Sequence, residues 1–354
     1  MILNLTIFAL RKCFNVIKNN PHKAIIYWLF TGCILTAVMV IIGGVTRLTE
    51  SGLSMTDWQL ISGAIPPLNE ADWQEVFNEY KQFPEYQKVN KGMSLSEFKF
   101  IFFWEYFHRV FGRLIGLVFI IPFLFFWLRK KISQKLMPKI ILIFVLGCFQ
   151  AFLGWWMVKS GLVDRPDVSH FRLAAHLISA FGLISYIFWV MLGLYFQKPF
   201  PVNKKLNRWI KLILVLVVLQ ILYGAFVAGL KAGLLCPVFP SMCNVDNLLA
   251  GNWTGNFALG MPEYLVKLNL QNIHRLLAYL VYGVIAILVV KAKRWKLSDM
   301  AKNGLNTLFL LVNVQFVLGV FTLIYQIPLL LGVLHQFVAL LLLLSIVYLL
   351  RVTR

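Results

Sequence analysis

The chain has 354 residues, of which 60% are hydrophobic and only 14% are charged, and its mean hydropathy is +0.76. This composition argues against a water-soluble enzyme and indicates a membrane protein. The 34 Lys and Arg against 14 Asp and Glu give a net charge of +20, which in a soluble protein would indicate nucleic acid as the partner. In a protein with several membrane spans, cytoplasmic loops collect the same excess, so we expect the lipid bilayer and no nucleic acid as a partner. Five Cys are too few for a disulfide scaffold.

Uncharged runs of roughly 20 residues, long enough to cross a bilayer, predict eight membrane-spanning helices. The last uncharged stretch, 303–350, is too long for one helix and contains Pro328, so we expect two spans there with a break at 326–328. The other predicted spans are 24–46, about 101–128, 140–158, 173–197, 212–230 and about 268–290. The predicted fold class is therefore all-α, in a polytopic membrane protein.

Loop charges predict the orientation of these spans. The segments on the side of the two termini hold 21 basic residues and one acidic residue, whereas the loops on the other side hold 9 basic and 12 acidic residues. Because cytoplasmic loops are enriched in Lys and Arg, both termini are expected in the cytoplasm. The apolar stretch near Ile25 has no obvious small-residue cleavage site, so we interpret it as the first span and not as a removable signal.

Two loops on the outer side are large. The first, 47–100, carries most of the acidic residues and a predicted amphipathic helix at 69–87. The second, 231–266, holds Cys236 and Cys243 among Pro, Gly and Asn residues and is expected to form an irregular cap. An oxidising compartment would allow these two Cys to form a disulfide, and two free thiols are the alternative.

The halves 1–200 and 201–354 are similar to each other, which indicates a duplication of four helices. The matched positions are 43–53 with 224–234, 107–110 with 273–276, Gln150 with Gln315, and His176 with His335. Each repeat has an even number of spans, so both halves are expected the same way up. We therefore predict two tandem four-helix bundles related by a pseudo-twofold axis along the membrane normal.

Four of the six His lie on the even-numbered spans, which all start from the outer face. They are His108, His176, His274 and His335. Each lies seven to nine residues past the last loop residue, which corresponds to about 10–14 Å of helix, so all four are expected at one depth. An ionisable side chain in the membrane is costly and is by default a functional hypothesis. Hydrogen-bonded bridges between helices are the alternative.

Two His pairs at one depth suit haem groups, because haem iron takes axial His ligands from both faces. The residue four positions after each His lies one turn below it on the same helix face. These residues are all small: Gly112, Ala180, Ala278 and Ala339. The missing side chains would leave room for a porphyrin plane beside each helix.

Basic residues accompany the candidate ligands near the outer surface. Arg109 and Arg275 each follow a candidate His, and Arg47 lies at the outer end of the first span. Arginine matches carboxylate geometry with two hydrogen bonds, so haem propionates are candidate partners. Anchoring of the helix ends at the membrane interface is the alternative.

The two halves differ in charge beside the candidate ligands. Glu105 lies three residues before His108, and its counterpart three residues before His274 is Gln271. A carboxylate at the edge of an apolar pocket can exchange a proton near neutral pH, whereas an amide cannot. We therefore expect chemistry in the N-terminal half and an electron-transfer or structural role in the C-terminal half. The alternative is that Glu105 only forms an ion pair with Arg109 or Arg113.

The combination of these motifs resembles the haem A synthase family, in its proteobacterial and mitochondrial branch, over essentially the whole chain. The motifs that carry the resemblance are Gly43-Gly44-Val45-Thr46-Arg47-Leu48-Thr49, Ser51-Gly52-Leu53-Ser54-Met55, Trp58, Glu105-x-x-His108-Arg109, and single His in the fourth, sixth and eighth spans. The resemblance implies oxidation of a ring methyl of haem O to a formyl group, through hydroxymethyl and geminal-diol stages with water as oxygen source. The product is haem A for terminal oxidases.

The resemblance also implies residue roles. His108 and His176 would hold the iron of haem O, with Glu105 assisting at the methyl, while His274 and His335 would ligate a permanent haem b. The pair formed by Cys236 and Cys243 would be a structural disulfide. Some members carry a Cys pair in the first outer loop, but this chain has none at 52–100, so a mechanism that needs a thiol there is in doubt.

The implied setting is a bacterial inner membrane, with the mitochondrial inner membrane as the second option, and the implied partners are haem O synthase and an electron acceptor. A di-haem b-type cytochrome that carries electrons without modifying haem is the alternative function. It explains the four His equally well and gives Glu105 no task.

Overall fold

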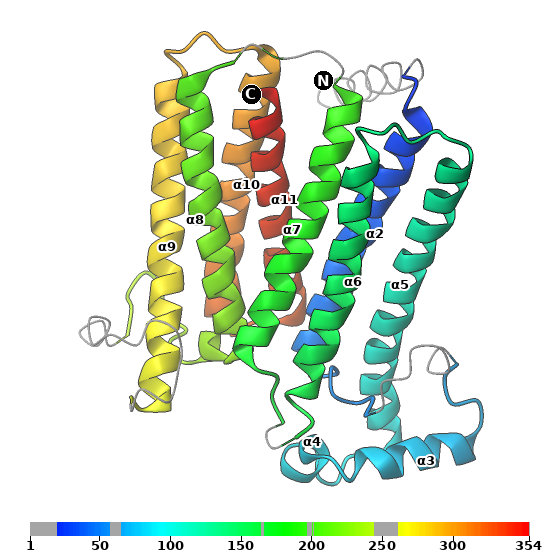
Figure 1. The fold of residues 1–354 in the computed structure, drawn as a ribbon. Coiled ribbons are helices and arrows are strands. Elements are labelled where there is room, and N and C mark those ends of the chain that lie inside the picture. Colours follow the sequence, from blue (N-terminus) through cyan, green and yellow to red (C-terminus); the bar gives the residue numbers. More distant parts are fainter. Residues whose placement is uncertain are drawn as a thin grey trace, which may run out of the picture.

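The computed structural model of the chain describes residues 20–56, 65–163, 166–196, 200, 202–243 and 261–353. All regular elements among these residues are helices, and eight of them are long and apolar enough to cross a membrane (Figure 1). The chain up to residue 19, on which part of the orientation prediction depends, and Trp58 of the N-terminal motif lie outside the described residues.

The eight predicted spans are confirmed. They are α2 (Lys23–Leu48), α5 (Leu95–Leu128), α6 (Met137–Lys159), α7 (His170–Tyr195), α8 (Lys204–Gly229), α9 (Glu263–Ala292), α10 (Asp299–Ile324) and α11 (Leu329–Val352). The break between α10 and α11 falls at the predicted position, directly before Leu329. Helix α5 begins six residues earlier than predicted because a capping box sets its start, in which Ser94 and Glu97 satisfy each other's backbone N–H groups.

The predicted single helix at 69–87 is wrong, since the structure has two helices there. Helix α3 (Glu70–Tyr80) is followed by a short helix α4 (Pro84–Lys88). Pro84 explains the interruption: proline has no N–H to donate and disfavours helical backbone in the residue before it. Phe83 accordingly is extended, with φ −94° and ψ 155°.

Four helices form the centre of the molecule and the other four spans flank them. Helices α2, α7, α8 and α11 pack against one another, with α5 and α6 beside one half and α9 and α10 beside the other (Figure 1). Helix α2 begins and α11 ends at the same end of the bundle. We call the opposite end, which carries α3, α4 and the 3₁₀ helix η2 (Ala232–Leu234), the outer end.

The largest buried apolar cluster lies mainly in the half of the bundle away from the outer end. It is built from residues with almost no exposed surface, such as Ile140, Ile184, Leu206, Ile285 and Leu349. In the outer half the helices share a much smaller cluster, centred on Phe226 and Leu270. The solid core therefore holds the helices together at one end and leaves the outer half free to enclose a site.

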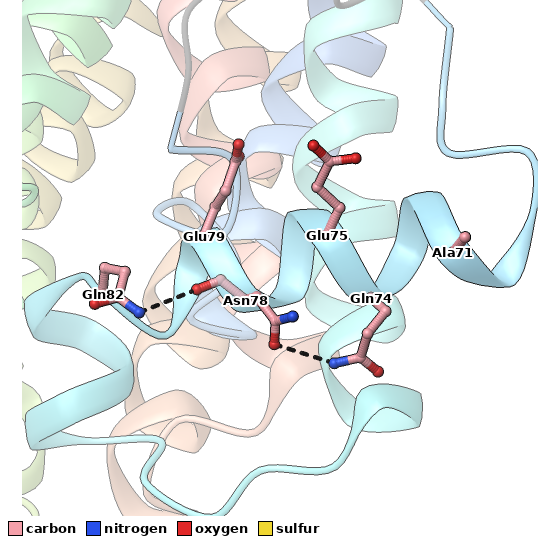
Figure 2. Close-up of a pocket in the computed structure, with 6 residues that line it drawn as sticks. All are labelled: Ala71, Gln74, Glu75, Asn78, Glu79 and Gln82. Carbon is pink, nitrogen blue, oxygen red and sulfur yellow. Dashed lines mark hydrogen bonds between the residues drawn. The ribbon is translucent and has the colours of Figure 1, made fainter.

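Aromatic packing fixes the first outer loop on α5. Phe77 of α3 stacks on Phe98 of α5 with 4.9 Å between ring centroids, and Tyr80 packs on the same ring at 5.0 Å. The opposite face of α3 is polar: Figure 2 shows Asn78 there, accepting a hydrogen bond from Gln74 Nε2 at 3.1 Å. This face lies away from the helix bundle and has no apolar wall, so the loop turns its packed side inward.

The same loop buries a carboxyl group. Glu85 is 5% exposed, and the Tyr80 hydroxyl donates a hydrogen bond to its Oε2 at 3.0 Å. Burial raises the pKa of Glu85 to about 8, and the negative charges of Glu105, Glu50 and Asp167 act in the same direction. The carboxyl is therefore protonated in the folded loop at neutral pH.

This burial makes the stability of the loop pH-dependent. The folded pKa lies above that of an unfolded chain, so the stabilisation is complete at low pH and is lost as the pH rises through about 8. We expect the protection factors of the amides at 70–90, which are corrected for the intrinsic pH dependence of exchange, to fall about tenfold or more between pH 6 and pH 9, and Glu85→Gln to remove this fall. The exposed Glu79→Gln on α3 is the matched control and should behave like wild type. An unchanged pH dependence in Glu85→Gln would contradict the assignment.

Candidate functional site

One cavity between the spans contains all the predicted site residues on them. Its volume is about 1040 Å³, and its walls include His108, His176, His274 and His335 together with Glu105. The small residues one turn below each His, Gly112, Ala180, Ala278 and Ala339, also line it. Side chains that are far apart in the sequence therefore face one shared space.

The two His of the C-terminal half face each other across this cavity. The ring centroids of His274 and His335 are 6.5 Å apart, and the ring planes meet at 77°. Imidazole nitrogens bind first-row metals at about 2.0–2.1 Å, so two imidazoles in line on one metal have centroids roughly 6 Å apart. His274 Nδ1 is buried and has no hydrogen-bond partner among the described residues. The pair thus fits a metal held between two imidazoles, as in a haem.

The two His of the N-terminal half, His108 and His176, line the same cavity. His170, at the outer start of α7, stays apart from both pairs. Its ring packs edge-on against Phe226, with 5.6 Å between centroids, and its backbone lies against Gly229. His170 is therefore a packing residue of the α7–α8 contact.

Each candidate His ring lies against a glycine of the preceding span. A Cβ placed on that glycine would lie 3.0–3.8 Å from the ring Cε1. The four contacts are Gly43 with His108, Gly154 with His176, Gly224 with His274, and Gly319 with His335. At 3.0 Å a Cβ would crowd the ring, so the glycines set the positions of His176, His274 and His335, whereas the 3.8 Å at Gly43 is an ordinary van der Waals contact with His108.

A glutamine one turn before the glycine contacts the His in three of the four positions. Gln150 Nε2 lies 3.0 Å from His176 Nδ1, Gln315 Nε2 lies 3.2 Å from His335 Nδ1, and Gln220 Nε2 lies 3.4 Å from His274 Nε2. These contacts are the polar bridges that the alternative interpretation expected. At His108 the equivalent position holds Met39, so this site alone lacks the amide.

The glycines and Gln220 were missed as site residues by the sequence analysis. The signal is present as Gln-x-x-x-Gly, which occurs at 150–154, 220–224 and 315–319 and places both residues on one helix face. Single matches of this pattern are too common to indicate a site. The pattern becomes informative when it is compared between the repeats.

Glu105 is 3% exposed, and donors approach both of its oxygens. Arg109 Nη2 donates to Oε1 at 2.6 Å, while Ser54 Oγ and the Met55 backbone N–H donate to Oε2, both at 2.8 Å. The ion pair that was weighed as an alternative therefore exists. Glu105 also ties the start of the first outer loop to α5.

Gln271 makes the corresponding contacts with reversed polarity. Its Nε2 donates to the carbonyl oxygens of Gly233 and Cys236, each at 3.2 Å. Both halves thus use the residue three positions before the His to hold the outer loop that follows the preceding span. Only the N-terminal half brings a negative charge to the cavity by doing so.

The arginines after the His also hold outer loops. Arg109 Nη2 donates to the Met55 carbonyl at 2.9 Å, and Arg275 Nη2 donates to the carbonyls of Val238 at 2.9 Å and Ser241 at 2.6 Å. Arg47 donates to the Ala228 carbonyl at 2.9 Å, and its buried Nε has no partner among the described residues. All three side chains line the cavity.

The second outer loop is closed by a disulfide between Cys236 and Cys243, whose Cα atoms are 6.0 Å apart. Asn272 Nδ2 donates to the Cys243 carbonyl at 2.9 Å, next to the Gln271 contact with Cys236. The disulfide expected from the resemblance is thus present, and α9 holds both of its ends. The described part of this loop forms a cap over the C-terminal His pair.

Comparison with known proteins defines the class to which this fold and site belong. The sequence model of the cytochrome oxidase assembly protein family COX15-CtaA matches residues 26–347. A haem A synthase of Flavobacterium psychrophilum is 48% identical over 339 residues, which are 94% of this chain and 98% of that protein. Haem A synthases of Flavobacterium johnsoniae and Nitrosospira multiformis are 46% and 43% identical, covering 93% and 92% of the chain and 97% and 92% of those proteins. The chain therefore belongs to the haem A synthase family.

The anchoring role of Gln271 can be tested by stability. Gln271→Leu would leave the buried carbonyls of Gly233 and Cys236 unpaired, which costs about 1–3 kcal/mol each. We expect a lower midpoint of thermal unfolding for the purified protein in detergent. Gln74→Leu on the exposed face of α3 is the control and should leave the midpoint unchanged. An unchanged midpoint for Gln271→Leu would show that the contact contributes nothing.

Proposed function

We propose that the protein is a haem A synthase that oxidises a ring methyl of haem O to a formyl group and so supplies haem A for terminal oxidases. The observation that carries this proposal is the asymmetry of the two His pairs. Both pairs line one cavity, but among the described residues only the pair of His108 and His176 has a carboxylate, Glu105, on the same helix three positions before a His. The substrate half is then 1–200 and the cofactor half is 201–354.

In this proposal His108 and His176 bind the iron of the substrate haem O, and His274 and His335 hold a resident haem b. The spacing of the His274 and His335 rings and the unpaired ring nitrogen of His274 support that assignment. When bound, haem b supplies one-electron redox chemistry at the C-terminal pair. Gln220 and Gln315 contact His274 and His335, so they orient the two rings.

The arginines lie where they can meet the carboxylates of a bound haem. The unpaired, buried Nε of Arg47 is the strongest candidate donor to a propionate. Arg109 and Arg275 each use an Nη2 atom on loop carbonyls, so a propionate on either of them would share the guanidinium with the loop. Binding of substrate and ordering of the outer loops would then be coupled.

Conversion of a methyl to a formyl group takes one oxygen atom from water and releases four electrons and four protons, which pass to an electron acceptor and to solvent. Positive charge develops at the methyl carbon as electrons leave. The negative charge of Glu105 stabilises that charge, and its carboxylate can take a proton from the attacking water. The Arg109 and Ser54 contacts fix the position of the carboxylate for both tasks.

The eight apolar helices and the loop charges support a bacterial inner-membrane location with both termini in the cytoplasm. The His pairs then lie in the outer leaflet. Haem O synthase is the proposed source of substrate. The electron acceptor is proposed only by its chemical class, a redox partner that reoxidises the resident haem.

Glu105→Gln separates the charge of Glu105 from its anchoring role. The amide oxygen can still accept a hydrogen bond from the Met55 N–H, so the loop stays attached while the negative charge is lost. We expect haem A formation by the purified protein to fall about 100-fold or more, with haem content retained. Glu97→Gln, an exposed change on the same helix, is the control. Unchanged haem A formation in Glu105→Gln would remove the catalytic assignment of Glu105, whereas absence of haem A formation by the wild-type protein would favour a di-haem cytochrome.

Spectra test the assignment of the two pairs. His274→Ala or His335→Ala should abolish the low-spin haem b signal in a reduced-minus-oxidised spectrum, because each removes an axial ligand. His108→Ala should mainly reduce bound haem O or haem A. His22→Ala, at the far end of α2, should change neither signal. The site assignment fails if the spectra of His274→Ala, His335→Ala and His108→Ala all coincide with wild type.

A further inference from the structure

The cavity is deeper in the N-terminal half than in the C-terminal half. On α5 its wall reaches Phe119, eleven residues beyond His108, whereas on α9 it reaches Val281, seven residues beyond His274. The same difference holds for the other helices of each half: the wall extends to Ile143 on α6 and Ile187 on α7, but only to Val312 on α10 and Leu342 on α11. We call the part of the cavity in the N-terminal half the N-terminal arm. At 1.5 Å per residue, this arm extends about 6 Å further along the helices than the part in the C-terminal half.

Missing side chains create the deeper arm. A Cβ added to Gly32, Gly116 or Gly147 would meet nothing within 4 Å, and all three glycines line the cavity. The repeat places larger residues at the equivalent positions of the C-terminal half. They are Ile213 for Gly32, Tyr282 for Gly116, and Val312 for Gly147. Ile213 and Val312 are 1% and 4% exposed, so these positions are filled in that half.

The two halves also differ in how their flanking helices meet. Tyr282 of α9 packs on Phe316 of α10 with 5.3 Å between centroids, and its hydroxyl donates to Asn313 Oδ1 at 3.1 Å. The equivalents of Tyr282, Phe316 and Asn313 in the N-terminal half are Gly116, Ala151 and Cys148. The described parts of α5 and α6 accordingly lack the close packing seen between α9 and α10.

The N-terminal arm has an aromatic floor and an exposed side. Phe119 packs on Trp28 and on Phe144, with 5.2 and 5.9 Å between ring centroids, and this group closes the deep end. Above it, Gly116, Cys148 and Ala151 line the cavity and are exposed on the molecular surface. Apart from Arg113 and Thr36 the arm is lined mainly by apolar residues, and it opens between α5 and α6, towards the lipid.

We propose that this arm, between α5 and α6, binds the long isoprenoid chain of the substrate haem and admits it sideways from the bilayer. The inference rests on the proposed function, because it assigns the substrate to the N-terminal His pair. Haem O carries such a chain and a b-type haem does not. In the C-terminal half side chains occupy the corresponding space, so that site accepts only the haem without a chain. The two sites therefore select their haems by the presence or absence of the isoprenoid chain. Apolar burial of the chain along the arm supplies affinity that the ring alone cannot.

Transfer of the C-terminal residues into the N-terminal half tests the proposal. The variant Gly116→Tyr with Ala151→Phe should fill the opening between α5 and α6. Gly147→Val is a smaller change that should fill the arm itself. Binding of added haem O and of added protohaem, the same type of ring without the chain, is measured by absorbance titration of the purified protein containing its resident haem. We expect at least tenfold weaker binding of haem O by each variant, with protohaem binding changed less than threefold.

Gly182→Leu is the matched control, because Gly182 lies on α7 of the same half, has free space around it and does not line the cavity. It should bind both haems like wild type, and an intact haem b spectrum in every variant verifies folding. Unchanged haem O affinity, or an equal loss for both haems, would overturn the chain-binding arm. Haem A formation by wild type is measured in parallel, and its absence would refute the proposed function. If the variants still bound haem O more weakly while binding protohaem normally, the chain-binding arm would be supported even in that case.

Discussion

The contact between a histidine ring and a glycine on the neighbouring span is the constraint on which the rest of the site depends. It occurs four times, between α2 and α5, α6 and α7, α8 and α9, and α10 and α11. In three of these contacts a Cβ on the glycine would lie only 3.0 Å from the imidazole, so the approach of the two helices sets the position of the ring, while at Gly43 and His108 the distance is 3.8 Å. The apolar core at the other end of the bundle holds the helices in this arrangement, and the outer loops, tied down by Glu105, Gln271 and their arginines, close the cavity above it.

Two halves of similar sequence carry two different sites, which differ at a small number of positions. The residue three positions before each first His is an acid in one half and an amide in the other, and both hold a loop, so Glu105 adds a negative charge to a structural role that the two residues share. The residues below the His pairs differ mainly in size, with Arg113 in place of Tyr279 as a difference in charge. The negative charge of Glu105 thus marks the His pair beside which we propose the chemistry. The volume of the side chains below each His pair determines which haem that pair can accept.

Much of the fold could be predicted because it follows from short-range properties of the chain. Spans follow from hydropathy, and the break before Leu329 follows from Pro328; Pro84, a stronger signal than the amphipathic pattern around it, should have predicted the division of α3 from α4. The His positions were found because an ionisable residue in an apolar span is conspicuous. The glycine contacts and the loop carbonyls held by Arg109 and Arg275 could not be predicted, because they depend on which helices pack together and on backbone groups that a sequence pattern does not reveal.

The central claim is that two imidazole pairs in one cavity hold two different haems. Extraction of the pigments from the purified protein, followed by chromatographic separation and quantification against protein, tests it most directly. The account predicts two haems per chain at full occupancy, one of them b-type and the other haem O or haem A. A protein that yields b-type haem alone, or a single haem per chain after supply of haem O, would contradict it.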